Sequence, residues 1–351
     1  MKRPIQNIFL LSASTIFCII FAETSLRLFY PQEDYLEFLI KDPVFRMANA
    51  TNFEGKYRFG HFRTPVNVRL NSQGMRGDQF DPADTSGLRI LLIGDSFTFG
   101  WGLEDSQTFA HFLQLNLDRL SEYRVKVLNG GVVGWGSTQE IMYLERNYEA
   151  LQPDIVIATF VSNDIADDND FFAWQKTGKG ELIDFPGKRL LVQSHLVQFL
   201  RVLRLKLRNK LSGEDLNSKW ENTVKNNPGI DKERFSLVNL YGEQEWCQLQ
   251  DTYGRLADFC REKSIILIIQ SADYDSKCAD SFFTKFVTDK PSVRYNLLSP
   301  VFNDDSIRKP YFFKNDGHWT PFANASVAHK LFEIISTNKF LELASTHRRS
   351  S

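Results

Sequence analysis

The order of apolar runs in this 351-residue chain predicts an α/β fold, with a central parallel sheet covered by helices on both faces. Two observations indicate this class. Short apolar runs typical of buried strands alternate with longer segments that carry apolar residues at helical spacing. Glycine and polar residues directly follow three of the strand-like runs, as loops at one edge of a parallel sheet do. The sequence also predicts an N-terminal hydrophobic helix and a helical insertion.

Composition is that of an ordinary globular protein, with 42% hydrophobic and 24% charged residues. The net charge of −1 implies no overall electrostatic partner, so we expect no nucleic-acid binding. Cys247 and Cys260 lie about 20 Å apart on one predicted helix and cannot pair with each other, so at most Cys278 pairs with one of them. No Cys/His cluster has the spacing of metal ligands, and we expect no metal.

The N-terminal residues 1–30 have the pattern of a signal anchor or transmembrane segment. Lys2 and Arg3 precede an apolar run from Ile8 to Ala22, which further apolar residues extend to Phe29. A cleaved signal peptide and a buried core helix are the alternatives. By the positive-inside rule, the bulk of the chain is expected to be extracytoplasmic, either periplasmic or at the cell surface.

The elements follow in order along the chain. Residues 31–87 form an N-terminal extension of irregular to β character. After it, we predict a strand at 89–93, a helix at 107–120, a strand at 125–128, a helix at 138–149, a strand at 154–161, a helix at 244–263, a strand at 265–270 and a helix at 321–336. Thr320 and Pro321 have the chemistry of an N-cap and a first helical residue.

The alternation is interrupted over 167–240, which is too long for a plain loop. This stretch opens acidic and continues basic, and we interpret it as an insertion or a cap over the strand ends. Within it, Arg201, Arg204 and Arg208 recur at helical spacing, and leucines line another face. Three interpretations of this helix stay open: contact with a membrane surface, attraction of an anionic substrate, or the solvated face of a cap helix. The chain is expected to end in a disordered tail over 341–351.

Three strand ends and the segment before the last helix carry residues suited to acyl transfer, which needs a nucleophile, a base, a group that orients the base, and donors for the oxyanion. Ser96 follows the first strand of the alternation and can be the nucleophile. His318 can be the base, with Asp316 as its orienting group. The oxyanion donors would be the N–H groups of Ser96 and Gly134 and the side-chain amide of Asn163.

Each of these stretches, taken alone, is more often a helix cap or a turn. Together they resemble the SGNH (GDSL-type) hydrolase superfamily over residues 88–340. The stretches that carry the resemblance are "GDSFTFG" at 94–100, "NGGVVG" at 129–134, "SND" at 162–164 and "DGHW" at 316–319. The resemblance implies a three-layer α/β/α fold like flavodoxin, the same site residues, and ester hydrolysis or acyl transfer without a cofactor.

The chain departs from the family pattern at two positions. One residue separates Asp316 from His318 where the family usually has two, and Asn315 stands where its Asp usually lies. Branches that acetylate polysaccharides are similar to the shorter spacing, so Asp316 is kept as the orienting residue. Val161 replaces the usual Gly of the third block, which matters less because the side chain of Asn163 does the work.

Upstream of the first block, "RLNSQGMRG" at 69–77 resembles a segment of membrane-anchored members of the superfamily. Asn71, Gly74 and Arg76 are therefore candidates for lining the site. The alternative is a β-turn with an exposed Arg.

The sequence thus predicts a membrane-anchored, extracytoplasmic serine esterase that acts on a small acyl ester of a cell-envelope glycan or lipid. An O-acyltransferase that passes the acyl group to an envelope glycan is the second hypothesis. A non-enzymatic scaffold that retains the fold is the third.

Overall fold

A computed structural model describes residues 2–32, 36–59, 64–120, 122–178, 193–212, 243–273, 277–290, 292–302, 310–313 and 316–350. The chain divides into two compact units. The first comprises Met1–Leu36, Tyr57–Pro65 and Ile183–Gly229, and the second comprises Glu37–Lys56, Val66–Leu182 and Ile230–Ser351.

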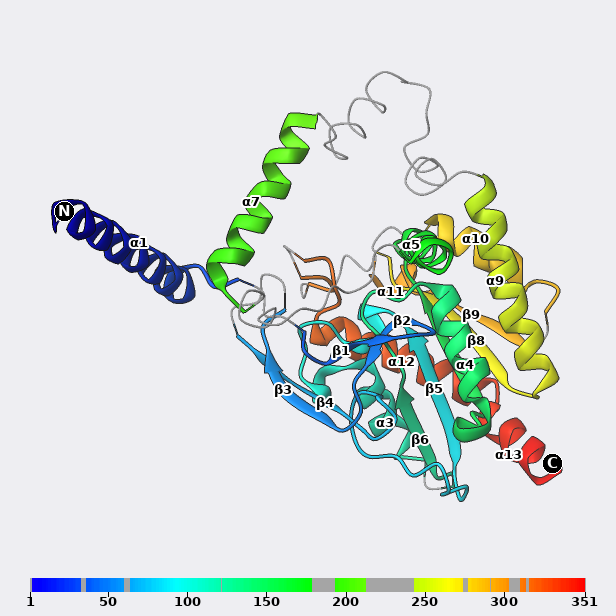
Figure 1. The fold of residues 1–351 in the computed structure, drawn as a ribbon. Helices are drawn as coiled ribbons and strands as arrows, with labels where there is room; N and C mark the ends of the chain where they lie inside the picture. The colour runs from blue at the N-terminus through cyan, green and yellow to red at the C-terminus, as the bar shows by residue number, and fades with distance from the viewer. Residues whose placement is uncertain are drawn as a thin grey trace. The chain divides into compact units, whose positions relative to one another are not determined.

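The second unit is built on a parallel sheet whose described strands lie in the order β6-β5-β7-β8-β9 (Figure 1). The strands are β5 (Leu88–Gly94), β6 (Val125–Asn129), β7 (Ile155–Phe160), β8 (Ile266–Ser271) and β9 (Val293–Asn296). Counted from β5, this is the 2-1-3-4-5 order of flavodoxin-like, doubly wound sheets. The predicted fold class is confirmed.

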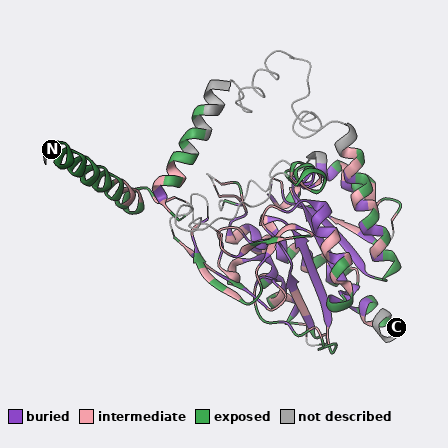
Figure 2. Ribbon diagram, viewed as in Figure 1, coloured by how far each residue is buried: buried purple, intermediate pink, exposed green. Residues whose placement is uncertain are grey.

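Helices cover both faces of this sheet. One face packs in a core with α3 (Phe109–Leu117), α12 (Pro321–Thr337) and α13 (Phe340–Ser350), and the other with α4 (Ser137–Leu151), α9 (Glu243–Glu262) and α10 (Lys277–Val287). Along β5, Ile90 and Leu92 join the first core, whereas Leu91 and Ile93 join the second. Burial on both faces explains why residues 90–93 of this strand are a continuous apolar run rather than an alternating one (Figure 2).

Most predicted elements are confirmed to within two residues, including Thr320 as the N-cap and Pro321 at the start of α12. The helix predicted over 107–120 is shorter than expected. A 3-10 turn, η1 (Asp105–Gln107), comes first, and the side chain of Thr108 then caps α3 by accepting from the His111 N–H. Helices α5 (Asp164–Thr177) and α11 (Ser299–Phe302) complete the unit.

Two parts of the second unit were missed. Strand β9 and helix α10 were not predicted, because a four-residue strand with the sequence VRYN carries little pattern and forms by pairing with β8. The expected disordered tail over 341–351 is wrong as far as Ser350. Helix α13 continues to that residue. Its apolar side chains Phe340, Leu341 and Ala344 are buried in the core that α12 also lines.

The N-terminal extension forms two two-stranded sheets, β1 (Leu39–Asp42) antiparallel to β2 (Arg46–Asn49), and β3 (Phe53–Tyr57) paired with β4 (Val66–Leu70). Most of it belongs to the second unit rather than standing apart. The Asn49 side chain donates to the Gly131 carbonyl at 3.1 Å, and the Arg76 N–H donates to the Asn129 carbonyl at 3.0 Å. The extension is therefore fastened to the segment that follows β6.

The first unit contains α1 (Lys2–Phe29) and α7 (His195–Ser212). Pro4–Phe29 has a mean hydropathy of 2.0 and an exposed apolar surface, and it is long enough to cross a membrane (Figure 2). Membrane anchors and signal sequences share this property, whereas the alternative of a buried core helix is wrong. Glu23 of α1 caps α7 by accepting from the N–H groups of His195 and Leu196.

Helix α7 exposes both charged and apolar side chains. The exposed charged residues include Arg201 and Arg204, and the exposed apolar ones include Leu200 and Leu203. The three interpretations of this helix therefore remain predictions. The predicted insertion begins inside α5, and residues 179–192 and 213–242 of it lie outside the described part of the chain.

Candidate active site

The candidate nucleophile lies at the carboxyl edge of the sheet. Ser96 is the first residue of α2 (Ser96–Phe99), directly after β5, and Asn163 follows the neighbouring strand β7. The chain leaves β5 for β6 on one side and later returns to β7 on the other, so this edge is the topological switch point at which such sheets bind ligands. Asp95 caps α2 by accepting from the Phe97 N–H at 2.9 Å.

The glycine-rich segment after β6 packs directly on α2. A Cβ placed on Gly131 would lie 2.3 Å from the backbone nitrogen of Phe99, closer than any real contact. Only glycine therefore fits at this position. Further along this segment, Gly134 has a φ of +75°.

A hydrogen-bonded relay connects Ser96 to residues more than 200 positions away. Ser96 Oγ lies 2.8 Å from His318 Nε2, and His318 Nδ1 is hydrogen bonded to Asp316 Oδ1. These contacts have the connectivity of a Ser-His-Asp triad. The structure thus brings together the three side chains that the sequence singled out, while Asn315 lies outside the described residues.

A tight turn makes the short Asp-x-His spacing workable. The Phe313 N–H donates to the His318 carbonyl at 2.9 Å, and the Asp316 N–H donates to the Phe313 carbonyl at 3.2 Å. Between the two relay residues, Gly317 has a φ of +86°, a conformation that favours glycine. The turn folds the Asp316 carboxylate back onto the imidazole, which a helix could not do at this spacing.

The Asp316 carboxyl is held in its charged form. Partial burial acts to raise its pKa, but the hydrogen bonds from His318 and Trp101, together with the His318 charge, outweigh burial and lower the pKa below its usual value. The carboxylate is therefore ionised at neutral pH, as stabilisation of an imidazolium requires.

Two aromatic side chains that the sequence analysis did not assign enclose the imidazole. The ring centroid of Phe97 lies 4.7 Å from that of His318, and Trp101 stacks on the same ring at 5.4 Å. Trp101 also donates its indole N–H to Asp316 Oδ2 at 3.2 Å. The signal in the sequence was a tryptophan five residues after the nucleophile.

The candidate oxyanion donors have unequal surroundings. The Ser96 N–H, at the first position of α2, has no intrahelical partner. The Asn163 amide is exposed and donates to Asp95 Oδ2 at 3.3 Å and to Asp167 Oδ2 at 2.9 Å. Asp95 Oδ2 also accepts from Ser96 Oγ at 3.2 Å, so Asn163 and Ser96 share a partner. The roles of Gly134 and Asn163 as oxyanion donors remain predictions.

Buried carboxyl groups lie beneath this edge of the sheet. Burial raises the pKa of Asp95, and it raises the pKa values of Glu140 and Asp164 well above their usual range. Burial also raises the pKa of Asp168 to about 6, although the Thr138 N–H and hydroxyl donate to this carboxylate. Burial therefore shifts each of these carboxyl groups toward its neutral form, which lessens the negative charge that would oppose an oxyanion at Ser96.

Other candidates from the sequence have different outcomes. Asn71 forms an Asx turn by accepting from the Gln73 and Met75 N–H groups, so the β-turn at this segment is confirmed. The exposed-Arg interpretation is wrong, because Arg76 is buried.

Cys247 and Cys260 are free thiols, and the side chain of Cys278 lies outside the described residues. Within the described part of the chain, no group of three or more His, Cys, Asp or Glu side chains could hold a metal ion.

No protein-family model matches this chain, and no curated protein matches it. Solved structures to which it is similar include the psychrotrophic esterase EstA from Pseudoalteromonas sp., with 13% identity and a TM-score of 0.40 over 71% of this chain and 97% of that chain. A member of the lipolytic protein G-D-S-L family from Veillonella parvula DSM 2008 has 12% identity and a TM-score of 0.41 over 71% and 98%. An acetyl xylan esterase, AlAXEase, has 12% identity and a TM-score of 0.41 over 71% and 100%. Because these identities and TM-scores are low, the function proposed below is based on the residues of this chain.

Proposed function

We propose that this protein is a membrane-anchored serine esterase of the SGNH type, which forms a covalent acyl-enzyme on Ser96. The single observation that carries the proposal is the unbroken relay from Ser96 Oγ through His318 to Asp316 at a switch point of the sheet. A serine hydroxyl is a weak nucleophile until a base takes its proton. His318 Nε2, at 2.8 Å from the hydroxyl oxygen, is within reach to do so.

The reaction proceeds in two halves. Ser96 Oγ attacks the acyl carbonyl carbon while its proton moves to His318 Nε2, and Asp316 stabilises the imidazolium. The tetrahedral oxyanion accepts hydrogen bonds from the N–H groups of Ser96 and Gly134 and from the Asn163 amide. Collapse of this intermediate transfers the proton from His318 to the leaving alcohol and leaves the acyl group on Ser96. A water molecule, activated by the same imidazole, then releases the acid and restores the free serine.

The oxyanion assignment requires one rearrangement of Asn163. Within the described residues, its amide donates two hydrogen bonds, to the carboxylates of Asp95 and Asp167. Burial raises the pKa of Asp167 to about 6, so this carboxyl competes less strongly for the amide as pH falls toward 6. Exposure of Asn163 leaves room for its amide to turn toward a substrate oxygen.

The test uses the full chain in detergent with p-nitrophenyl acetate and a longer-chain p-nitrophenyl ester. We expect turnover of the acetyl ester by the wild type and loss of turnover in Ser96→Ala and His318→Ala. A fluorophosphonate probe should label the wild type and not Ser96→Ala. Wild-type protein that neither hydrolyses the esters nor reacts with the probe would overturn the esterase proposal.

The acyl acceptor separates this proposal from an O-acyltransferase, which uses the same residues and the same first half-reaction. The exposed apolar helix α1 favours an acceptor in the cell envelope, whether glycan or lipid. Adding acetylated and free envelope glycans to the esterase assay decides between water and a sugar hydroxyl. Product that carries the acyl group on the glycan would favour the transferase.

Extracytoplasmic placement is proposed from the positive charges of Lys2 and Arg3 before the apolar helix. Alkaline phosphatase fused after residue 350 should be active, because it folds only outside the cytoplasm. An inactive fusion, with an active cytoplasmic reporter at the same position, would reverse the orientation.

A further inference from the structure

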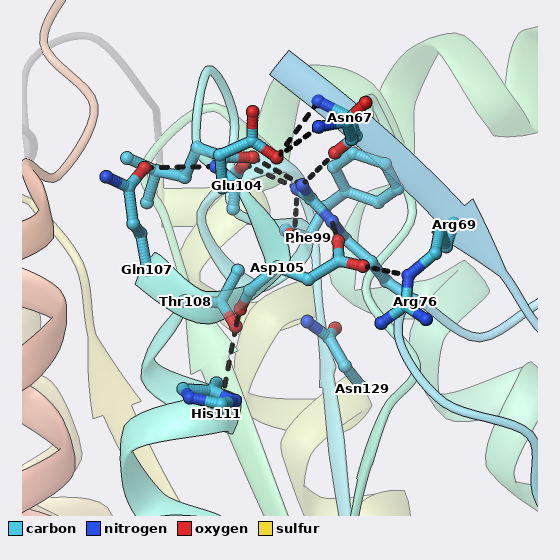
Figure 3. A network of polar contacts seen from close by, with 12 residues as sticks. Asn67, Arg69, Arg76, Phe99, Glu104, Asp105, Gln107, Thr108, His111 and Asn129 are labelled. Atoms are coloured by element: carbon cyan, nitrogen blue, oxygen red, sulfur yellow. Dashed lines mark hydrogen bonds and ion pairs between the residues drawn. The ribbon is translucent and has the colours of Figure 1, made fainter. Parts of the chain in front are cut away.

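The loop that follows the nucleophile helix is held by a buried arginine. Arg76 Nη1 donates to the carbonyls of Phe99 and Gly100 at 2.9 and 2.7 Å, and Nη2 donates to the Leu103 carbonyl (Figure 3). Its guanidinium also lies 4.7 Å from the Phe99 ring centroid. The three carbonyls bracket Trp101 on both sides, so Arg76 fixes the path of the chain at that residue.

The guanidinium is itself fixed from two directions. Arg76 Nε donates to Asp105 Oδ1 at 2.8 Å, and Nη2 donates to the Asn67 carbonyl at 3.2 Å. Its side chain is 1% exposed. A four-residue helix cannot satisfy the carbonyls of the loop beyond it, and buried carbonyls need donors. Arginine has five N–H donors in a rigid plane, which lysine cannot reproduce.

Trp101 connects this loop to the base side of the relay. Its backbone N–H donates to the Ser96 carbonyl at 3.0 Å, and its indole N–H donates to Asp316 Oδ2 at 3.2 Å. The indole ring also stacks on His318. Asp316 therefore has one oxygen on the imidazole and the other on the indole, which prevents the carboxylate from rotating away from His318.

We propose that Trp101 is a positioning residue for the Asp316–His318 pair, and that Arg76 acts on catalysis by holding the loop that carries Trp101. This inference rests on the proposed esterase function. The loop that carries Trp101 lies more than 200 residues from His318 in the sequence, and its contacts with the Asp316–His318 pair do not involve substrate.

The variants separate the two contributions of Trp101. Trp101→Phe keeps an aromatic face on His318 and removes the N–H donor, whereas Trp101→Leu removes both. We expect kcat to fall about tenfold in the first and about 100-fold in the second, with KM nearly unchanged, because the pair is displaced and the acyl site is not. Rates are expressed per active site titrated with the fluorophosphonate, so a smaller folded fraction does not imitate the effect.

Arg76 has a matched control in Arg69, which pairs with the other oxygen of Asp105 at 3.1 Å but is about half exposed (Figure 3). We expect Arg69→Met to retain the wild-type kcat and Arg76→Lys to lose about tenfold. If Arg76 acts through Trp101, the double variant Arg76→Lys/Trp101→Leu should lose no more than Trp101→Leu alone, because that substitution already removes both contributions of Trp101. Full additivity of the two losses would overturn the connection.

A second readout does not depend on turnover. The proton between His318 Nδ1 and Asp316 should give a low-field proton resonance, assigned by its loss in His318→Ala. We expect Trp101→Phe to shift or broaden this resonance and Arg69→Met to leave it unchanged. An unchanged resonance and an unchanged kcat in Trp101→Phe would overturn the inference. Absent esterase activity with a shifted resonance would overturn only the proposed function.

Discussion

Replacing Asp316 with asparagine tests the short Asp-x-His spacing directly. The amide has the size of the carboxyl but no charge, and its NH2 group can donate to His318 Nδ1. The imidazole would then carry its proton on Nε2, where it faces Ser96 Oγ at 2.8 Å and cannot accept the serine proton. The variant therefore keeps the turn and removes the base.

The size of the effect can be estimated from the contacts. Loss of one hydrogen bond between charged partners costs about 1.5–3 kcal/mol, which is about 10- to 150-fold in rate. The wrong tautomer adds to this loss, and the equivalent substitution in the triad of a serine protease costs about 10⁴-fold. We expect kcat/KM of Asp316→Asn to fall by about 10²- to 10⁴-fold.

The assay is p-nitrophenyl acetate hydrolysis by the full chain over pH 5 to 9, with Asn315→Ala as the neighbouring control. Because the pKa of Asp316 is lowered, its carboxylate stays ionised throughout this range. The variant should therefore be slower at every pH in this range, and titration of Asp316 itself should leave no step in the wild-type profile. The assignment of Asp316 as the orienting residue would be refuted if kcat/KM of Asp316→Asn stayed within threefold of the wild type while kcat/KM of Asn315→Ala fell strongly.

Three further predictions concern stability. Gly131→Ala should lower the free energy of unfolding, measured in urea, by about 3 kcal/mol or more, because the new Cβ would meet the Phe99 backbone. The control Gly254→Ala has open space around it and should be neutral or stabilising. Asp168 has a pKa of about 6 in the folded protein, against 3.8 for the solvent-exposed side chain of the unfolded chain. Its contribution to stability is therefore fully present below about pH 4 and falls by up to about 3 kcal/mol as pH rises through 6. Asp168→Asn should flatten this part of the stability curve, and an unaltered slope would contradict the raised pKa. Arg89 is 1% exposed and donates to several backbone carbonyls, so Arg89→Met should cost about 3 kcal/mol, and a melt that coincides with wild type would count against that role.

The sequence was sufficient for β5, β6, β7 and β8 because these strands carry their own signal. A strand buried on both faces is apolar over most of its length, and β5, β7 and β8 each contain an unbroken apolar run. Strand β9 lies at the edge of the described sheet and has two half-buried residues, so its apolar pattern is too short to recognise. The tail was misjudged for a related reason, since its polar end hid the apolar residues at 340, 341 and 344 that dock it.

The candidate site was predictable wherever topology alone decides position. Parallel strands end at one edge, so the residues after β5, β6 and β7 had to meet there. The positions of Asp316 and His318 at this edge could be predicted only from their place just before α12 and from the family resemblance. The turn that brings the two side chains together depends on hydrogen bonds of Phe313 and on the backbone conformation of Gly317, which the sequence pattern does not reveal.

Residues that act through other side chains have no such local signal. The sequence around Arg76 does not distinguish a buried arginine from an exposed arginine in a turn. Two of its partners are the backbone carbonyls of Phe99 and Gly100, and every residue has a backbone carbonyl, so these contacts leave no mark in the sequence. Trp101 acquires its role from a carboxylate 215 positions away. Trp101 directly follows the first block, and Arg76 lies in the segment 69–77 upstream of it. A bulky aromatic just after the first block and an arginine shortly upstream are therefore the features to test when a nucleophile of this kind is found.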